Sequence, residues 1–475
     1  MNNSTVNKLF NINSFFGGFS KLAFSTILKF LVQIVIAIVF SKKLSLNEYA
    51  AYQYLWMYVN VFSVLGLFGV SSLVLSSSLG EILQWAKKNK YYIVSFVIIV
   101  NLIAILVILF GNYTLSLLDK LLMFSLLLCQ NFSLLLESIC IKNKNLKKLF
   151  YVNLAYIVLY TAVHFYSIYT SYTLTILLIG IVAATILKCI FLFSEFKINN
   201  KVIHEHNKSI GNQWFYLGIN DTIAVLVKWI DKWIVLAILP ATQFAIYFNG
   251  TFEIPIFLLL LSVIGNISIV ELSKTKEINV TDLKLIFEKS SILLASIIFP
   301  SFWFLIYYCN DIFMILFANK YAQSIPIFKV SLLILPLRIV YSTAVLQLQN
   351  KTNLIVRGAI LDFLLTIIFI LILYPIWQLK GLAFAFVAAT FIQITYYLWC
   401  TSKLLQKKIF YFFPIKKILI LFTISFCSIY IANFLSLNSN TMTRIFLGTI
   451  ICTILVSILL IIFYKNLRKV TTTQN

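Results

Sequence analysis

The sequence contains fourteen apolar stretches, and its lysines concentrate in every second connection between them. Each stretch has about the twenty residues that a helix needs to cross a hydrocarbon core of roughly 30 Å, where a helix satisfies its own backbone polar groups. We therefore predict an all-α polytopic membrane protein of about 14 transmembrane helices. The predicted spans are 21–40, 52–73, 92–110, 121–141, 150–169, 174–193, 214–239, 244–270, 291–316, 325–348, 354–374, 382–400, 418–437 and 445–464.

The distribution of basic residues predicts the orientation of the chain. Connections and span ends on the side of the N-terminus hold 26 lysines and arginines, and the opposite connections hold 6. Short loops rich in Lys and Arg face the cytoplasm, according to the positive-inside rule. Both termini are therefore predicted to be cytoplasmic.

The composition excludes a soluble protein. Hydrophobic residues make up 61% of the chain, charged residues make up 11%, and the mean hydropathy is +0.96. The net charge of +23 does not predict a nucleic-acid partner, because the lysines lie beside span ends at one face, where anionic lipid headgroups attract them. The seven cysteines show no disulfide framework, and the three histidines show no metal-binding pattern.

The second half of the chain repeats features of the first half. LSLNEYAAY at residues 44–52 returns as LPATQFAIY at residues 239–247, 195 residues later, and GVSS at residues 69–72 is echoed by GNIS at residues 265–268. The shared offset indicates duplication of a six-helix unit, with two parallel copies and a cleft between them. The predicted domains are an N-terminal lobe at 1–205, a C-terminal lobe at 206–405, and two further spans with a cytoplasmic tail at 406–475.

Four segments carry a resemblance to a known family: LSLNEYAAY after the first span, DKWIVL in the seventh, FANKYAQSIPIF before the tenth, and Gly381 after the eleventh. Over residues 19–405 the chain resembles the polysaccharide flippases of the multidrug/oligosaccharidyl-lipid/polysaccharide exporter superfamily. The resemblance implies two pseudo-symmetric six-helix lobes, like those of multidrug and toxin extrusion transporters, which alternate between inward-open and outward-open states.

The resemblance also implies a substrate and a location. The substrate would be an undecaprenyl-diphosphate-linked oligosaccharide, such as an O-antigen repeat unit for lipopolysaccharide or a related polysaccharide. The protein would move it from the inner to the outer leaflet of a bacterial plasma membrane. A polysaccharide polymerase and chain-length proteins are the implied protein partners, beside membrane lipids.

Intramembrane cations indicate what the cleft would bind. Burying a charge at mid-bilayer costs about 2.5–3.5 kcal/mol even on a lenient insertion scale, so such residues face water or an ion-pair partner. A diphosphate is an anion that Lys and Arg attract. Lys188 and Lys329 lie near span ends, and we expect them to snorkel to the membrane surface. The predicted lining of a cationic substrate cavity is Lys29, Lys228, Lys232 and Arg338.

Intramembrane carboxylates have two interpretations that the sequence leaves open. Each one either couples a proton or a cation to transport or neutralises a nearby cation. Lys228, Asp231 and Lys232 share one helix face, so they are also candidates for a structural ion-paired set. No catalytic residue, metal or cofactor is predicted. The candidate coupling or charge-balancing residues are Asp231, Glu253, Asp362 and Glu137.

Two other classes of function stay open beside the flippase. A multidrug or lipid II exporter of the same superfamily is the first, although the excess of cations over carboxylates at mid-depth disfavours cationic drugs as cargo. A membrane glycan polymerase or transferase is the second. The sequence disfavours an enzyme, because it contains no P-loop, nucleophile elbow or HExxH motif, and its outer connections hold just Glu48, Asp119 and Asp311 as clear acidic residues.

Overall fold

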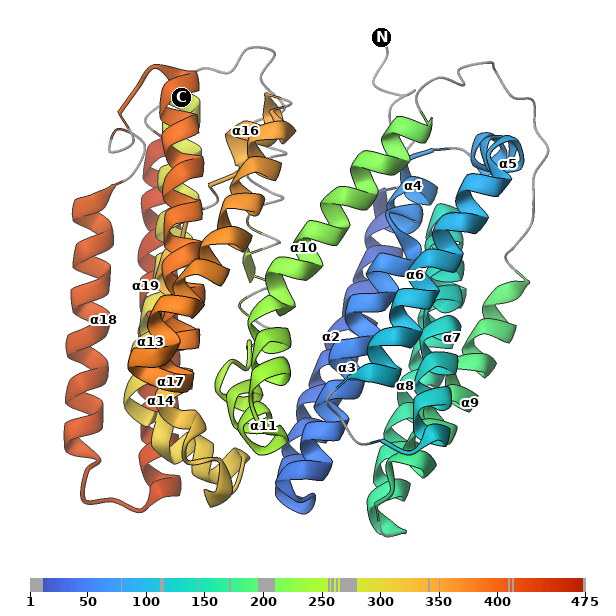
Figure 1. Ribbon diagram of the computed structural model, residues 1–475. Coiled ribbons are helices and arrows are strands. Elements are labelled where there is room, and N and C mark those ends of the chain that lie inside the picture. Colours follow the sequence, from blue (N-terminus) through green and yellow to red (C-terminus); the bar gives the residue numbers. More distant parts are fainter. Residues whose placement is uncertain are drawn as a thin grey trace. The chain divides into compact units, whose positions relative to one another are not determined.

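A computed structural model describes residues 12–77, 79–111, 115–143, 145–170, 172–194, 210–254, 280–340, 342–349, 351–408 and 414–472, together with 257, 260, 261, 264 and 411. These residues form helices and connections without a strand (Figure 1). Eight of the helices so described are long and apolar enough to span a membrane, or nine if one bent pair is a single span. The prediction of an all-α, multi-pass membrane protein is confirmed, and the count of 14 spans stays a prediction.

The chain divides into two compact units. The first contains Met1–Trp229 and Leu236–Ala245, and the second contains Ile230–Val235 and Ile246–Asn475. The predicted domain boundaries at residues 205 and 405 are those of a duplicated six-helix unit, and this duplication stays a prediction. Its second GVSS-like segment, 265–268, lies outside the described residues.

The first unit is a helical bundle. Within it α7 packs against α3, α4 and α9, and α8 packs against α2 and α9. Figure 1 shows α7, α8 and α9 side by side in cyan and green. Its helices are α2 (Ile12–Lys43), α3 (Leu46–Leu67), α4 (Val70–Ser76), α5 (Leu79–Lys88), α6 (Lys90–Phe110), α7 (Leu117–Lys142), α8 (Leu146–Tyr169), α9 (Leu174–Phe193) and most of α10 (Ile210–Ile238).

Capping residues set where these helices begin. Ser45 and Glu48 form a capping box, in which the Ser45 side chain accepts from the Glu48 backbone N–H and the Glu48 carboxylate accepts from the Ser45 N–H. Ser116 and Thr173 cap α7 and α9 with single bonds. Such caps satisfy backbone donors that lack a helical partner, and each contributes about 0.5–2 kcal/mol. The capping box explains SLNE in the first copy of the motif, whereas the second copy has PATQ at these positions.

A break separates α3 from α4. Phe68 and Gly69 both have left-handed backbone, with φ of 37° and 75°, and the two helices meet at a bend of 52°. Gly69 is required there for a second reason. A Cβ atom on Gly69 would lie 2.5 Å from the backbone nitrogen of Gly218 in α10.

The contact between Gly69 and Gly218, here called the glycine crossing, is reinforced by polar side chains. A Cβ atom on Gly218 would lie 2.3 Å from the Phe68 ring. Ser72 Oγ donates to Asp221 Oδ2 at 3.2 Å, and Gln213 Nε2 donates to Ser76 Oγ at 3.0 Å. The first half of α10 is therefore fixed to the break between α3 and α4.

The second unit contains a helical hairpin within α17. Gln378 has non-helical backbone, with φ of 53° and ψ of −134°. The Tyr397 hydroxyl donates to the Ile355 carbonyl at 2.8 Å, although a continuous helix would separate these residues by about 60 Å. The chain therefore reverses, and the two arms correspond to predicted spans eleven and twelve. A Cβ atom on Gly381 would lie 2.2 Å from the Leu373 carbonyl oxygen, which explains the glycine after this turn.

The tenth predicted span, 325–348, is divided into the short helices α14, α15 and α16. Pro336 and the non-helical residue Arg338 divide it. The helices of the second unit are α13 (Val280–Leu316), η1 (Asn319–Tyr321), α14 (Ser324–Ser331), α15 (Ile334–Leu337), α16 (Ala344–Leu348), α17 (Thr352–Leu405), α18 (Ile415–Leu435) and α19 (Thr441–Thr472), while α11 (Ala241–Gly250) contributes to both units.

The last two helices pack against α13. Toward the start of α13, Glu288 accepts from Lys417 of α18 at 2.6 Å. Toward its end, Asp311 pairs with Arg444 of α19 at 3.3 Å. Tyr308 lies between the two pairs and packs against Ile429 and Cys452. An ion pair thus joins α18 to α13 near the start of α13, and another joins α19 to α13 near its end.

Candidate functional site

The first unit contains a buried charged group that helices α2, α7 and α9 contribute. Lys188 of α9 forms an ion pair with Glu137 of α7, and its side chain is 4% exposed. The Lys188 ammonium also lies 4.7 Å from the centre of the Tyr156 ring of α8. Lys29 of α2 interacts electrostatically with both Lys188 and Glu137. Two predicted site residues, Lys29 and Glu137, are therefore brought together.

The position of the Lys188 side chain differs from the prediction. We expected this lysine to snorkel to the membrane surface, but it points into the bundle and pairs with Glu137. The partner lies 51 residues earlier in the sequence, so no local pattern reveals it. With Lys29, Lys188 and Glu137 together, the interior of the first unit holds more cations than carboxylates at this point, which favours an anionic ligand.

A column of rings continues from the charged group along α8. Tyr156, Tyr160 and His164 are spaced by four residues, and the Tyr160 and His164 ring centres lie 4.1 Å apart. His164 is fully buried, with Nδ1 2.7 Å from the Tyr160 carbonyl and Nε2 3.4 Å from the Tyr52 hydroxyl. This arrangement agrees with a packing role for His164.

Three charges, Lys228, Asp231 and Lys232, lie within two turns of α10. Lys228 is exposed in the first unit, 5.8 Å from the centre of the neighbouring Trp229 ring. In the second unit, Asp231 is buried, pairs with Lys232 at 3.2 Å and accepts from the Tyr247 hydroxyl at 2.9 Å. Sequence spacing identified Asp231 and Lys232 but not Tyr247. These contacts favour the structural interpretation of Asp231.

The second unit brings Arg338, Glu253 and Asp362 together. Arg338 follows the last residue of α15 and has non-helical backbone. Its Nη2 atom lies 3.8 Å from Oε1 of Glu253. Arg338 also interacts electrostatically with Asp362 of α17. Asp362 is 2% exposed, and its Oδ1 has no hydrogen-bond partner among the described residues. Arg338 thus interacts with two carboxylates, and one of them, Asp362, has an oxygen without a hydrogen-bond partner among the described residues.

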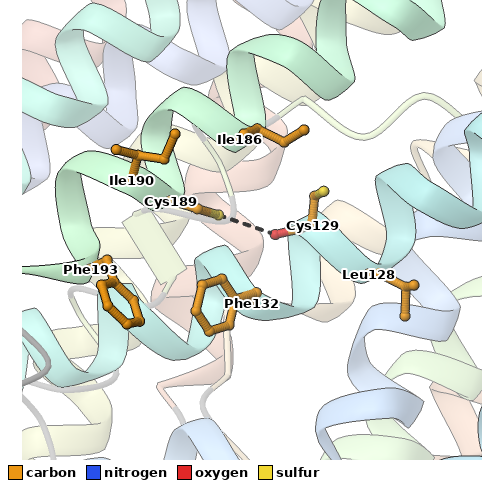
Figure 2. Close-up of a pocket in the computed structure, with 7 residues that line it drawn as sticks. All are labelled: Leu128, Cys129, Phe132, Ile186, Cys189, Ile190 and Phe193. Atoms are coloured by element: carbon orange, nitrogen blue, oxygen red, sulfur yellow. Dashed lines mark hydrogen bonds between the residues drawn. The ribbon is translucent and has the colours of Figure 1, made fainter.

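An apolar groove lies next to the Lys188–Glu137 pair, and its lining contains no charged residue. Its volume is about 450 Å³, and it is lined by apolar side chains between α7 and α9 (Figure 2). The Cys189 thiol contacts the Cys129 carbonyl oxygen at 3.5 Å across it. Such a lining suits hydrocarbon but not a diphosphate. The lining residues are Leu128, Cys129, Phe132, Ile186, Cys189, Ile190 and Phe193.

Comparison with solved structures identifies the fold. The chain is similar to the lipid II flippase MurJ in an inward closed conformation, with a TM-score of 0.68 and 16% identity over 94% of this chain and 99% of that one. This chain has a MurJ-like fold. It is also similar to an inward-facing multidrug resistance MATE family transporter of the MOP superfamily, with a TM-score of 0.55 and 11% identity over 81% and 98% of the two chains. No family profile and no curated protein matches the sequence.

Proposed function

We propose that this protein is a flippase for an undecaprenyl-diphosphate-linked oligosaccharide, an O-antigen or related polysaccharide repeat unit. The observation that carries the proposal is the MurJ-like fold over 94% of the chain, combined with cations inside both units. The protein would act in the inner membrane of a bacterium with both termini in the cytoplasm. A polysaccharide polymerase and chain-length proteins would receive its product.

The basic residues would lower the barrier for the diphosphate. The proposed ligands are Lys29, Lys228, Lys232 and Arg338. Each has positively charged N–H groups that can donate hydrogen bonds to a phosphate oxygen. Glu137 and Lys188 would hold Lys29 in place, because the fixed pair sets the field around it. Alternating access of the two lobes would then carry the headgroup between leaflets.

The carboxylates of the second unit are the proposed coupling element. Among the described residues, Asp362 Oδ1 has no hydrogen-bond partner, although the residue interacts with Arg338. A proton or a cation that binds this oxygen would supply the missing partner. Glu253 would share Arg338 with it. Asp231 would instead neutralise the charge of Lys232, because its carboxylate already accepts from the Tyr247 hydroxyl and forms an ion pair with Lys232.

Deleting the gene tests the substrate. We expect an undecaprenyl-diphosphate-linked polysaccharide repeat unit to accumulate on the cytoplasmic face. Accumulation of lipid II would favour the alternative of a lipid II exporter, which the similarity to MurJ supports. If no lipid-linked glycan accumulates and drug sensitivity rises, the multidrug alternative replaces the proposal. Formation of glycan bonds by the purified protein would instead indicate a polymerase or transferase.

Neutral substitutions test the cationic ligands. Lys29→Gln, Lys228→Gln and Arg338→Gln are each expected to lower surface polysaccharide about tenfold to hundredfold, since a hydrogen bond to a charged group is worth about 1.5–3 kcal/mol. Lys29→Arg and Arg338→Lys should retain more activity, because they keep the charge. The measurement is surface polysaccharide per unit of membrane-inserted protein. Normal polysaccharide in all three Gln variants would exclude a cationic site.

Asp362→Asn tests the coupling element. The substitution keeps the shape of the side chain but removes its charge, so we expect normal protein abundance and at least about a tenfold loss of transport driven by an ion gradient. Flipping of labelled lipid-linked oligosaccharide in vesicles, with a proton or sodium gradient imposed, measures this. Glu288→Gln is the matched control, because Glu288 pairs with a largely exposed lysine. An unchanged response to the gradient in Asp362→Asn would exclude coupling at this residue.

A further inference from the structure

Three lysines of the second unit lie over two exposed aromatic rings, one in the last turns of α17 and one just beyond it. The Lys403 ammonium lies 3.8 Å from the centre of the Trp399 ring. Lys284 of α13 and Lys407, which follows α17, lie 4.5 Å and 5.9 Å from the centre of the Tyr411 ring. Segments more than a hundred residues apart in the sequence thus bring two ammonium groups to one ring, within about 10 Å of each other.

The backbone holds this arrangement in place. Gln406 has left-handed backbone, with φ of 52°, and ends α17. The Lys407 N–H donates to the Ser402 carbonyl at 3.2 Å, while Ser402 Oγ donates to the Lys407 carbonyl at 2.6 Å. Lys407 is therefore fixed against the last turn of α17.

The described carboxylates do not pair with these three lysines. Glu288 lies nearby in the sequence of α13, but it is paired with Lys417. For Lys284, Lys403 and Lys407 no ion pair is recorded in the part of the chain that the structure describes. A ring face attracts an ammonium group but accepts none of its three N–H donors in a full hydrogen bond, so an anion is the complementary ligand.

We propose that Lys284, Lys403 and Lys407, together with Trp399 and Tyr411, bind the headgroup of an anionic phospholipid. Trp399 is 48% exposed and Tyr411 38% exposed, and rings of this kind lie at the headgroup level of a bilayer. The phosphate oxygens of one headgroup accept from two flexible ammonium groups that are within about 10 Å of each other. The site lies on the side that the lysine distribution predicts to be cytoplasmic, where anionic lipids are available.

Lipid-dependent stability of the full chain tests this proposal, and it needs no transport assay, so its failure would leave the proposed flippase function untouched. The chain is reconstituted in phosphatidylcholine nanodiscs with and without phosphatidylglycerol, and thermal stability and bound phosphatidylglycerol are measured. We expect phosphatidylglycerol to raise the Tm. Each Lys→Gln substitution should weaken lipid binding about fivefold, which is the equivalent of about 1 kcal/mol per lysine.

The triple variant Lys284→Gln/Lys403→Gln/Lys407→Gln should lose most of the lipid-dependent Tm shift. Its matched control removes three exposed lysines of the first unit, Lys87, Lys88 and Lys147, and should lose much less of the shift, because it leaves the lysines of the proposed site in place. A triple variant that keeps the shift, or a control that loses it equally, would overturn the proposal. So would protection by undecaprenyl phosphate without protection by phosphatidylglycerol, which would assign the site to the transported lipid.

Single variants keep the test decisive if the triple variant does not fold. Lys284→Gln and Lys407→Gln should each weaken phosphatidylglycerol binding in native mass spectra, whereas Lys284→Arg and Lys407→Arg should retain it. Equal binding by the Gln and Arg variants would overturn the proposal, because the headgroup would then not depend on these charges.

Discussion

Replacing Glu137 by glutamine is expected to remove most of the folded protein from the membrane, and replacing Lys188 by methionine in the same chain is expected to restore it. The single substitution leaves the Lys188 ammonium inside the first unit without its carboxylate. Breaking a buried ion pair from one side costs about 3–5 kcal/mol, whereas replacing both partners by residues of similar volume is often neutral. The measurements are protein abundance in the membrane and thermal stability in detergent.

The control for this prediction is Glu288→Gln, which breaks an ion pair with a lysine that is 63% exposed. Exposed pairs contribute about 0–1 kcal/mol, so this variant should fold normally. A stable Glu137→Gln variant, or an equally unstable double variant, would contradict the expected role of the pair. Transport by the folded double variant would also show that Glu137 balances charge and does not couple an ion.

Substitutions at the glycine crossing have the second large expected effect. Gly69→Ala is strained twice, because its left-handed φ costs about 1–2 kcal/mol and its Cβ atom would meet the Gly218 backbone at 2.5 Å. Gly218→Ala would meet the Phe68 ring at 2.3 Å. Overpacking of this kind typically costs about 1–3 kcal/mol. We expect both variants to unfold at lower temperature than the wild type, with the larger loss for Gly69→Ala.

The two glycines differ in what can relieve the clash. Phe68→Ala makes room beside Gly218→Ala, so this double variant should regain stability. The same change should not rescue Gly69→Ala, because the obstruction there is backbone. Gly211→Ala is the control: its Cβ atom would lie 3.1 Å from the Trp85 side chain, so a small shift accommodates it. Rescue of both variants by Phe68→Ala would show that the crossing is less tightly packed than described.

The fold was largely predictable because hydrophobicity along a membrane helix is a local property. The prediction for the sixth span, 174–193, coincides with α9, and the hairpin of α17 appears as two spans around Gly381. The tenth span was predicted as one segment that contains Pro336, and the structure divides it into α14, α15 and α16. Its apolar composition is that of a regular span, and the effect of Pro336 depends on how neighbouring helices accept the break.

The candidate site was predictable in composition but not in pairing. Depth in a span identified Lys29, Arg338 and Asp362 as intramembrane charges, but depth does not tell which helices face one another. Lys188 therefore escaped the predicted set. Helical spacing suggested Lys232 as a neighbour of Asp231, and the two form an ion pair, but the spacing gave no sign of Tyr247, which lies 16 residues further along the chain. Ligand roles for these residues stay a prediction.

The attachment of α18 and α19 to α13 imposes an order on biosynthesis. Glu288 and Asp311 enter the membrane long before their partners, which follow 129 and 133 residues later. At ordinary translation rates that delay is on the order of ten seconds. During this interval two carboxylates on one helix lack their cations. Asp311 is the more affected of the two, because its side chain is 13% exposed in the folded chain, whereas Glu288 pairs with a lysine that is 63% exposed. The nascent chain therefore depends on water, lipid headgroups or insertion factors beside Asp311 until Arg444 of α19 has been made.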